Sequence, residues 1–420
     1  MEYIIKKPTP GGDVKKEDKK EDEKKEDIKE DEKKEDIKED EKIEVYEETQ
    51  NEINEVKENE INEENDEELL KEIEEEENHI IKEEKDLEEI KGNMEKLEIN
   101  DLKSDKLLEK LNSVHFENLE NLSIVNTSIN SLDFLVNDCF KTLIILEIRN
   151  NDISSISKFK EAPFKDLRVL DLSTNKIESV VDIQNVPFKD IEILILSNNN
   201  ISDITPLSEV SFTKLKKLDL SNNKIQTIKC LEKNNNFTSL ESLYLNGNQI
   251  SDLSVFKKKG YFKKLKELQL NNNLIESLND LEGLDCHDLE ELLLYGNKIK
   301  FIAPICKGQF AKLKTLSLGK NQIESLEFLD KGNFENLEKL DLFDNQIREI
   351  NVIKNINFNK LVELDLSFNS MKSIDDLLTK KFEQLKTLKI EGNKGLNYSN
   401  DNIQSLYKQY NIKYTYNCLI

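Results

Sequence analysis

Hydrophobic positions recur from residue 116 to residue 395 with an almost constant period. Each unit follows the template F-x-x-L-x-x-L-x-L-x-x-N-x-I-x-x-L, and the units are 24 residues apart except for two intervals of 25 residues around Phe237. Twelve units match, and they begin at Phe116, Phe140, Phe164, Phe188, Phe212, Phe237, Phe262, Cys286, Phe310, Phe334, Phe358 and Phe382. A period of this length is typical of a solenoid, in which each unit packs only against its neighbours.

Alternation within the unit predicts a short strand. In "LDLSTN", Leu170 and Leu172 flank Asp171, so the leucines point to one side of an extended chain and the aspartate points to the other. Twelve such segments would pair side by side as a parallel ladder. We therefore expect a buried leucine face, and an outward face whose residues the core does not dictate.

One asparagine recurs in nearly every unit, and Thr127 stands at its place in the first unit. A chain that turns inward after a short strand leaves buried backbone N–H and C=O groups without partners, and a carboxamide can donate to one and accept from another. We predict that this row is structural. Its members are Asn151, Asn175, Asn199, Asn223, Asn248, Asn273, Asn297, Asn321, Asn345, Asn369 and Asn393.

The pattern L-x-x-L-x-L-x-x-N-x-I resembles the leucine-rich repeat superfamily. "NNNISDITPL" and "NGNQISDLSVF" are most similar to its short-unit class, which includes bacterial internalins and a nuclear regulator of protein phosphatase 1. The resemblance implies an α/β solenoid, a horseshoe of about 12 repeats over residues 116–395 with parallel strands on its concave face.

The charge lies in the N-terminal part of the chain. Residues 1–100 hold 19 Lys and Arg against 41 Asp and Glu, so this part carries most of the net charge of −25 of the whole chain. "EKKEDIKED" occurs twice in succession, at 23–31 and 32–40. Residues 1–65 contain too few apolar groups to offset the entropy of ordering, and we expect an acidic, low-complexity, disordered arm that aids solubility or attracts basic partners.

Three further segments have helical patterns. Ile73, Ile80, Leu87 and Met94 are seven residues apart, which predicts a charged amphipathic helix at 66–100. The helix would form a coiled-coil dimer, fold back on the repeats or stay free of them. We expect a cap helix at 101–115 before the first repeat. A C-terminal cap at 396–420 would combine a helix with a closing strand in "IKYTYNCLI".

Catalytic and cofactor chemistry has little support. The five cysteines are scattered, which favours free thiols in a reducing compartment and hence a cytoplasmic or nuclear protein. Cys286 and His287 are adjacent and cannot present nucleophile and base to one substrate atom. No spacing typical of a metal site or phosphate loop occurs, the repeats are not basic, and no apolar run is long enough to span a membrane. We expect no enzyme, no cofactor, no nucleic-acid partner and no membrane partner.

The outward strand positions are the remaining candidates for function. Repeats 6–11 place aromatic and aliphatic residues on or beside this face with aspartates along its edge, an arrangement typical of protein interfaces. The predicted site comprises Tyr244, Leu293, Tyr295, Phe343, Phe368, Asp219, Asp341 and Asp365. A second apolar group comprises Ile145, Val169, Ile193 and Ile195, and it is either another contact or a seat for the N-terminal segment.

The predicted function is therefore a non-enzymatic scaffold that binds a protein with basic and apolar surface on the concave face. The resemblance leaves two alternatives open. One is a regulatory subunit of a protein phosphatase, and the other is an internalin-like surface adhesin. The sequence does not identify the partner or the oligomeric state.

Overall fold

The computed structural model describes residues 79–232, 237–257, 260–284, 286–308, 310–380, 382–398 and 401–409. They belong to one compact unit, Asn78–Ile420. The predicted acidic arm at 1–65 and the closing strand at 412–420 lie outside the described residues.

A parallel sheet runs through the described residues. Its strands follow one another in chain order, and each pairs with the next through the whole sheet. The fourteen strands are β1 (His79–Ile81), β2 (Lys96–Asn100), β3 (Asn121–Val125), β4 (Ile145–Glu147), β5 (Val169–Asp171), β6 (Ile193–Ile195), β7 (Lys217–Asp219), β8 (Ser242–Tyr244), β9 (Glu267–Gln269), β10 (Glu291–Leu293), β11 (Thr315–Ser317), β12 (Lys339–Asp341), β13 (Glu363–Asp365) and β14 (Thr387–Lys389). The predicted solenoid of parallel strands is confirmed, and it begins two strands earlier than expected.

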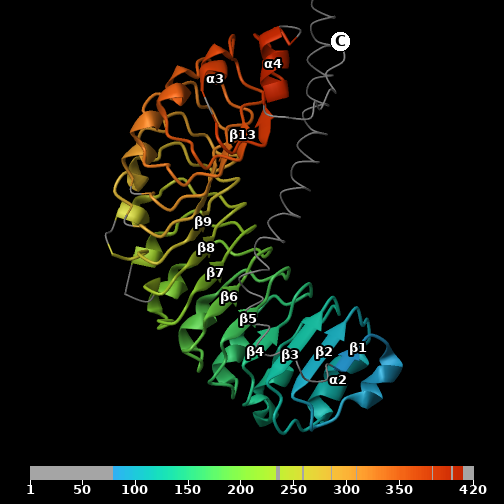
Figure 1. Ribbon diagram of the computed structural model, residues 1–420. Helices are drawn as coiled ribbons and strands as arrows, with labels where there is room; N and C mark the ends of the chain where they lie inside the picture. Colours follow the sequence, from blue (N-terminus) through green and yellow to red (C-terminus); the bar gives the residue numbers. More distant parts are fainter. Residues whose placement is uncertain are drawn as a thin grey trace, which may run out of the picture. The chain divides into compact units, whose positions relative to one another are not determined.

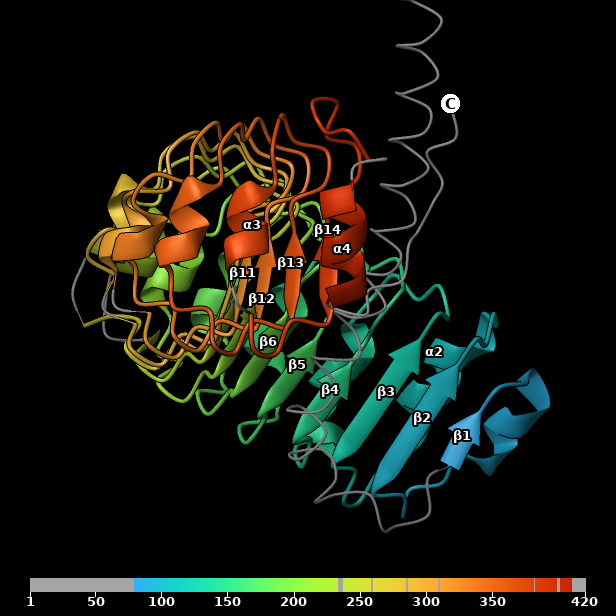
Figure 2. The ribbon, with the colours of Figure 1, turned by 45° about the horizontal axis from the view of Figure 1, so that its top comes forward.

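Short helices return the chain from each strand to the next. Figures 1 and 2 show the strands along one face of this unit, on the inner side of its curve, and the helices along the opposite face. The α-helices are α2 (Lys106–Ser113), α3 (Asp375–Thr379) and α4 (Asp401–Gln409). The 3-10 helices are η1 (Glu84–Glu89), η2 (Asp133–Val136), η3 (Asp138–Phe140), η4 (Ser157–Glu161), η5 (Val181–Asn185), η6 (Thr205–Glu209), η7 (Lys229–Glu232), η9 (Ser254–Lys257), η10 (Asn279–Leu281), η11 (Ile305–Lys307), η12 (Leu329–Lys331) and η13 (Asn351–Asn355).

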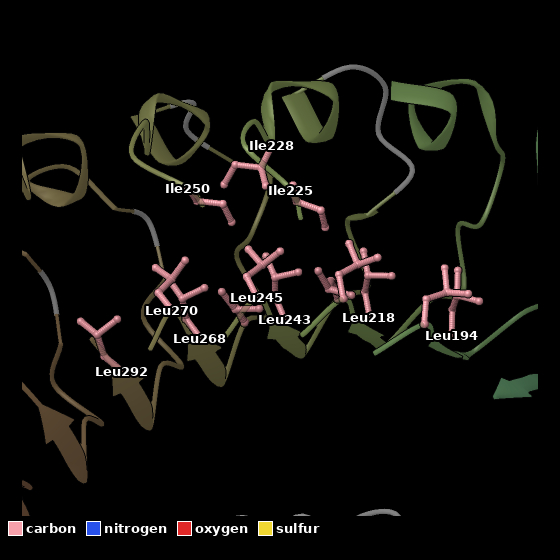
Figure 3. Close-up of a cluster of buried hydrophobic side chains, with 14 of the residues drawn as sticks. Leu194, Leu218, Ile225, Ile228, Leu243, Leu245, Ile250, Leu268, Leu270 and Leu292 are labelled. Atoms are coloured by element: carbon pink, nitrogen blue, oxygen red, sulfur yellow. The ribbon is translucent and has the colours of Figure 1, made fainter. Parts of the chain in front are cut away.

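Aliphatic side chains fill the space between strands and helices. Figure 3 shows the inward leucines of β6 to β10 in a row, with Ile225, Ile228 and Ile250 facing them from the other side of the core. The recurring phenylalanine closes the far wall, where the rings of Phe188 and Phe212 stack at 6.4 Å between centroids. Burial of one such side chain contributes roughly 1.5–3 kcal/mol as an upper estimate, so a core that repeats in every turn supplies most of the folding free energy.

The helix predicted at 66–100 is wrong where the structure describes it. Residues 79–100 form β1, η1 and β2, and β2 pairs in register with β3. Ile80, one of the residues spaced by seven, is exposed, whereas its neighbour Ile81 is buried. The heptad spacing therefore does not mark one face of a helix, because Leu87 and Met94 reach the core from a 3-10 helix and a loop.

The helix expected at 101–115 is present as α2, with Leu107 and Leu111 buried. It does not cap the end of the sheet, because it lies between β2 and β3 and takes the place that 3-10 helices hold in later repeats. The template does not detect this earlier repeat because a buried leucine, Leu102, stands where Thr127 and then the asparagines stand.

The asparagine row forms a buried ladder that joins consecutive repeats. Asn223 donates from Nδ2 to the carbonyl oxygens of Leu220 and Ser221 in its own repeat, and to that of Leu196 in the preceding repeat. Its Oδ1 accepts from the backbone N–H of Ile201, also in the preceding repeat, at 3.0 Å. The same set of bonds recurs at Asn199, Asn248 and the later members. The predicted structural role is confirmed.

A tight turn precedes each ladder asparagine. The residue before it has a positive φ, as in Asn198 (54°), Asn222 (52°) and Gly247 (62°). Asparagine and glycine tolerate this left-handed conformation better than other residues, which explains the "NN" and "GN" pairs along the sequence. This turn directs the ladder carboxamide into the core.

The C-terminal cap begins immediately after the last ladder residue. Tyr398 accepts from the backbone N–H of Asn393 at 2.8 Å and donates to the carbonyl oxygen of Ile390 at 3.0 Å. From α4, Ile403 and Leu406 are buried against the core, as expected of the helix predicted in the C-terminal cap.

Replacing Asn223 with alanine should lower the free energy of unfolding by roughly 3 kcal/mol. The change leaves the N–H of Ile201 buried without its partner, and it removes the bonds that Asn223 donates to the carbonyl oxygens of Leu196, Leu220 and Ser221. Urea denaturation measures the loss. Asn222→Gly is the matched control, because this exposed neighbour keeps its left-handed turn, and its effect should stay within about 0.5 kcal/mol. Equal losses in the two variants would contradict the ladder's role.

A chain that ends at Asn393 should aggregate, because it lacks Leu396, Ile403 and Leu406 and exposes the core of the last repeat. A chain that ends at Gln409 retains these residues and serves as the control. Light scattering and thermal melting distinguish the two, and a soluble, cooperatively melting chain ending at Asn393 would contradict the cap.

Candidate functional site

The predicted site residues lie at the ends of strands and in the turns that follow. Asp219, Tyr244, Leu293, Asp341 and Asp365 are the last residues of β7, β8, β10, β12 and β13. Tyr295 and Phe343 follow β10 and β12 by two residues, and Phe368 follows β13 by three. The structure therefore separates Asp219 and Tyr244 from a larger group at β10 to β14.

Three aromatic rings form a cluster in this larger group. The rings of Tyr295 and Phe343 stack at 6.5 Å between centroids with an interplanar angle of 17°. Phe368 meets Phe343 edge to face at 5.3 Å. Such pairs contribute about 0.5–1.5 kcal/mol beyond the area they bury, so each ring fixes the position of the next.

Glycine makes the stacking possible. Tyr295 and Phe343 belong to repeats that are two strands apart, and Gly319 occupies the equivalent place between them. A Cβ atom on Gly319 would lie 2.7 Å from the Tyr295 ring and 2.8 Å from Oδ2 of Asp341. The missing side chain therefore lets the rings approach each other above it.

Phe368 stands where other repeats have residues suited to a left-handed turn. Its φ is 53°, and the equivalent positions include Asn222, Gly247 and Asn272. A bulky aromatic residue rarely adopts this conformation, which costs of order 1–3 kcal/mol. The next repeat has Gly392 here, and a Cβ atom on it would lie 2.7 Å from the Phe368 ring. Strain of this kind is typical of functional positions.

Two carboxylates lie side by side at the base of the aromatic cluster. Asp341 and Asp365 are directly opposite each other in β12 and β13. Asp341 accepts from the Ser317 hydroxyl at 2.6 Å and from the Phe343 N–H at 2.9 Å. Burial, followed by the neighbouring Asp365 carboxylate, raises the pKa of Asp341 to about 6.

Two lysines, Lys339 and Lys389, partly balance this pair. Lys389, which continues the row in β14, lies 3.2 Å from Oδ2 of Asp365 and 3.5 Å from Glu363. Burial also raises the pKa of Glu391, two residues beyond Lys389. The end of the strand face thus carries more carboxylates than cations.

Asp219 and Tyr244 form a second, smaller group. Asp219 accepts from the Ser221 N–H at 2.8 Å and hydroxyl at 2.6 Å, and burial raises its pKa. The Lys217 ammonium lies 5.2 Å from the centroid of the Tyr244 ring, and the Tyr244 hydroxyl donates to Glu267. The charges and the ring hold one another in place.

Four of the eight predicted site residues are buried, although they stand at outward positions of the strands or of the turns. Tyr244 is 4% exposed and Phe343 is 5% exposed, and Leu293 and Asp365 are also buried. Neighbouring strands are only about 4.8 Å apart, so large side chains on adjacent strands cover one another. Tyr295, Phe368, Asp219 and Asp341 are partly buried and keep some accessible surface.

Sequence reasoning missed several residues that build this surface. Gly319, Ser317 and Lys389 support the rings and carboxylates, and Gly319 could have been found as the one glycine in its row of the outward positions.

Asp171, a buried acid near the second apolar group, has a pKa raised to about 6 by burial, with Arg149 3.7 Å away. Only contacts between strands reveal these roles. Of the second apolar group, Ile145, Val169 and Ile193 are buried.

The described cysteines are core residues. Cys139, Cys230, Cys286 and Cys306 are buried thiols. Burial raises the pKa of Cys139, and it raises that of Cys306 to about 12, which keeps these thiols protonated. Cys286 donates from Sγ to the carbonyl oxygen of Phe262 at 2.9 Å, as expected of a residue that replaces a core phenylalanine.

Neither a metal site nor a membrane span is found in the part of the chain that the structure describes. It contains no group of three or more His, Cys, Asp or Glu side chains that could hold a metal ion. Its helices are too short or too polar to cross a bilayer.

Comparison with known proteins agrees with this architecture. The family described as leucine-rich repeats in two copies matches residues 189–233, 238–283, 287–331 and 311–355. None of the curated proteins matches the chain in sequence.

Several solved structures are similar. An internalin (InlF) from Listeria monocytogenes has 26% sequence identity and a TM-score of 0.62, and the alignment covers 77% of this chain and 86% of the internalin. A leucine-rich repeat protein from Leptospira interrogans has 23% identity and a TM-score of 0.55, with 77% and 73% covered. A chain of the LRIM1/APL1C complex has 20% identity and a TM-score of 0.53, with 72% and 53% covered. Together with the parallel strands and the asparagine ladder, the family match identifies these repeats as leucine-rich repeats, and the similar structures show the same solenoid fold.

Proposed function

We propose that this chain is a non-enzymatic scaffold that binds a protein partner on its strand face, at the surface formed by β10 to β14. The observation that carries the proposal is the aromatic cluster of Tyr295, Phe343 and Phe368 above the paired carboxylates of Asp341 and Asp365. Leucine-rich repeat solenoids are protein-interaction scaffolds, which agrees with this function.

The carboxylate pair supports a partner with basic groups. The pair costs the folded chain stability, since the Asp365 carboxylate disfavours the ionised form of Asp341 and water is partly excluded from Asp341. Folding alone does not require them, because most repeats have no such pair in adjacent strands. A lysine or arginine of a partner would stabilise both carboxylates and convert this penalty into binding energy.

The aromatic cluster supports a partner that is also apolar. Tyr295 and Phe368 retain accessible surface, and the stacked Phe343 between them holds both rings rigid. Rigid aromatic side chains lose little entropy on binding and commonly act as interface hot spots. The acidic surroundings repel phosphate groups, which favours a protein over nucleic acid or an anionic membrane.

Two further features belong to this proposal. We place the protein in the cytoplasm or nucleus on its cysteine usage, and we assign the acidic N-terminal segment to solubility and to the encounter with basic partners.

A surface adhesin is the second candidate function, favoured by the likeness to the Listeria monocytogenes internalin. The regulatory subunit of a protein phosphatase stays a hypothesis from sequence. Protease shaving of intact source cells decides for the adhesin if it releases peptides of this chain, and co-purification with a phosphatase decides for the regulator.

Binding should depend on Tyr295, Phe368 and Asp341. Affinity capture with mass spectrometry identifies the main partner, and calorimetry with the purified partner measures the variants. We expect Tyr295→Ala, Phe368→Asn and Asp341→Asn each to weaken binding by about tenfold or more. Asp166→Asn, an exposed aspartate before β5, is the matched control and should bind as wild type does. Wild-type affinity in all three site variants would overturn the proposed surface.

The same Asp341→Asn change should raise stability at neutral pH. The folded pKa of about 6 exceeds the ordinary aspartate value, so the folded chain keeps a proton between pH 4 and 6 that the unfolded chain has lost. The stability contributed by Asp341 is therefore complete below pH 4 and is lost as the pH rises through 6.

Asparagine cannot ionise. Its Oδ1 can accept from the Phe343 N–H and its Nδ2 can donate to the Ser317 hydroxyl oxygen, so the variant should gain on the order of 1–3 kcal/mol over wild type at pH 7. The difference should shrink as the pH falls to 4. Urea denaturation at a series of pH values checks this. A variant less stable than wild type at pH 7, or a difference that does not change with pH, would contradict it.

A further inference from the structure

A second surface lies on the flank of the repeats, where the chain leaves the ladder turn and enters the 3-10 helix. Four residues after the ladder asparagine, nearly every repeat has a short polar side chain. Nine of these accept a hydrogen bond from the backbone N–H two residues on, at 2.8 to 3.4 Å, and so begin the next helix. They are Ser131, Ser155, Ser179, Asp203, Thr227, Asp252, Ser277, Ser325 and Ser373.

Phe301 breaks this rule. It follows ladder residue Asn297 by four, so it stands at the capping position of its repeat but has no acceptor. Its side chain is 76% exposed. Loss of such a cap destabilises the start of the helix, and an exposed ring does not offset this loss. The folded chain gains nothing from phenylalanine here, which points to a role outside folding.

Phe328 breaks a second rule in the next repeat. Its φ is 74°, a left-handed conformation that bulky residues rarely adopt, and its side chain is 46% exposed. Leu274, in the repeat before Phe301, is 42% exposed. Leu274, Phe301 and Phe328 are 27 positions apart, whereas one repeat has 24 residues. Each of them therefore lies one repeat further along the solenoid than the one before it, and three residues further along the chain within its repeat. Together they form an apolar diagonal, which we call the flank patch.

Charges of opposite sign border the flank patch. Lys298 and Lys300 are exposed in the repeat of Phe301, and Glu324 and Glu327 are exposed in the repeat of Phe328. Among the described residues, neither lysine has a carboxylate within ion-pair distance. Glu324 lies 3.7 Å from Arg348, and both side chains are mostly exposed. Glu276 is exposed in the repeat of Leu274, so the charges along the border alternate in sign from Glu276 through Lys300 and Glu324 to Arg348.

We infer that the flank patch is the interface of a homodimer. A two-fold axis between Phe301 and Phe328 brings Phe301 of one copy against Phe328 of the other, and it places Lys300 opposite Glu327 twice. The charge pattern selects a second copy over a foreign partner, since the patch is complementary to itself. The aromatic residues supply most of the binding energy, and the charge pairs fix the orientation.

The dimer leaves the strand face of each copy free to bind the proposed protein partner, so one dimer presents two strand faces. A partner with two copies of the binding segment would then bind with an avidity that one face cannot provide. The flank patch and the proposed function rest on different residues, so failure of one leaves the other intact.

Sedimentation velocity of the full chain, from low to high micromolar concentration, tests the inference. We expect a wild-type dimer, and monomers for Phe301→Ser and Phe328→Asn. Serine restores the cap found in other repeats and asparagine suits the left-handed turn, so both variants should fold, with melting temperatures of the monomer at or above that of wild type. The matched control is Val181→Ser, which removes an exposed apolar side chain from another repeat and should leave the dimer unchanged.

A charge exchange gives a second readout. Lys300→Glu and Glu327→Lys should each be monomeric alone, because each homodimer would have two like-charge contacts. An equimolar mixture should form heterodimers, because both contacts between residues 300 and 327 then pair a glutamate with a lysine. A wild-type chain that stays monomeric would overturn the inference and leave a foreign protein as the occupant of the patch. Dimers that persist in Phe301→Ser would place the interface elsewhere and overturn it as well.

Discussion

The buried carboxamide of the ladder asparagine is the interaction on which this structure depends. A strand of three residues followed by an inward turn leaves backbone groups in the core, and one side chain satisfies them in two repeats at once. Asn223 bonds to Leu220 and Ser221 in its own repeat and to Leu196 and Ile201 in the preceding one. The ladder therefore sets the shape of each turn and couples it to its neighbour, which leaves outward positions free to vary.

The ladder also explains how much of the fold the sequence predicts. Asparagine, leucine and phenylalanine must recur for the turns to stack, so period, strand direction and inward residues could all be derived. The repeat before Phe116 was missed because Leu102 replaces the asparagine, and because a chance spacing of seven that includes Ile80 and Leu87 suggested a helix. Without the ladder residue, the remaining leucines of that repeat do not distinguish a strand from a helix.

The candidate site was predictable only as a set of positions. Alternation identified Tyr244 and Phe343 as outward residues, but it could not show that contacts between neighbouring strands bury them. The room that Gly319 leaves and the shared burial of Asp341 and Asp365 depend on residues 24 positions apart in sequence. Such contacts follow from the register of the sheet, and one repeat alone does not contain them.

The positions that depart from the repeat become informative once the local role of each position is known. Phe368 occupies a turn that favours asparagine or glycine, and Phe301 occupies a helix cap. At each position an aromatic side chain at the surface replaces the residue that the local structure favours in the other repeats. The trade is consistent with selection for binding, since stability alone favours the residue found in the other repeats.

Native-state hydrogen exchange tests most directly whether the ladder holds the solenoid together. The N–H groups of Ile177, Ile201, Ile225 and Ile250 each donate to a ladder carboxamide of the following repeat. If the ladder couples the repeats, these amides should all exchange with the free energy of global unfolding measured by urea. Exchange of each amide at its own, much lower free energy would show that the repeats open independently and would contradict the account.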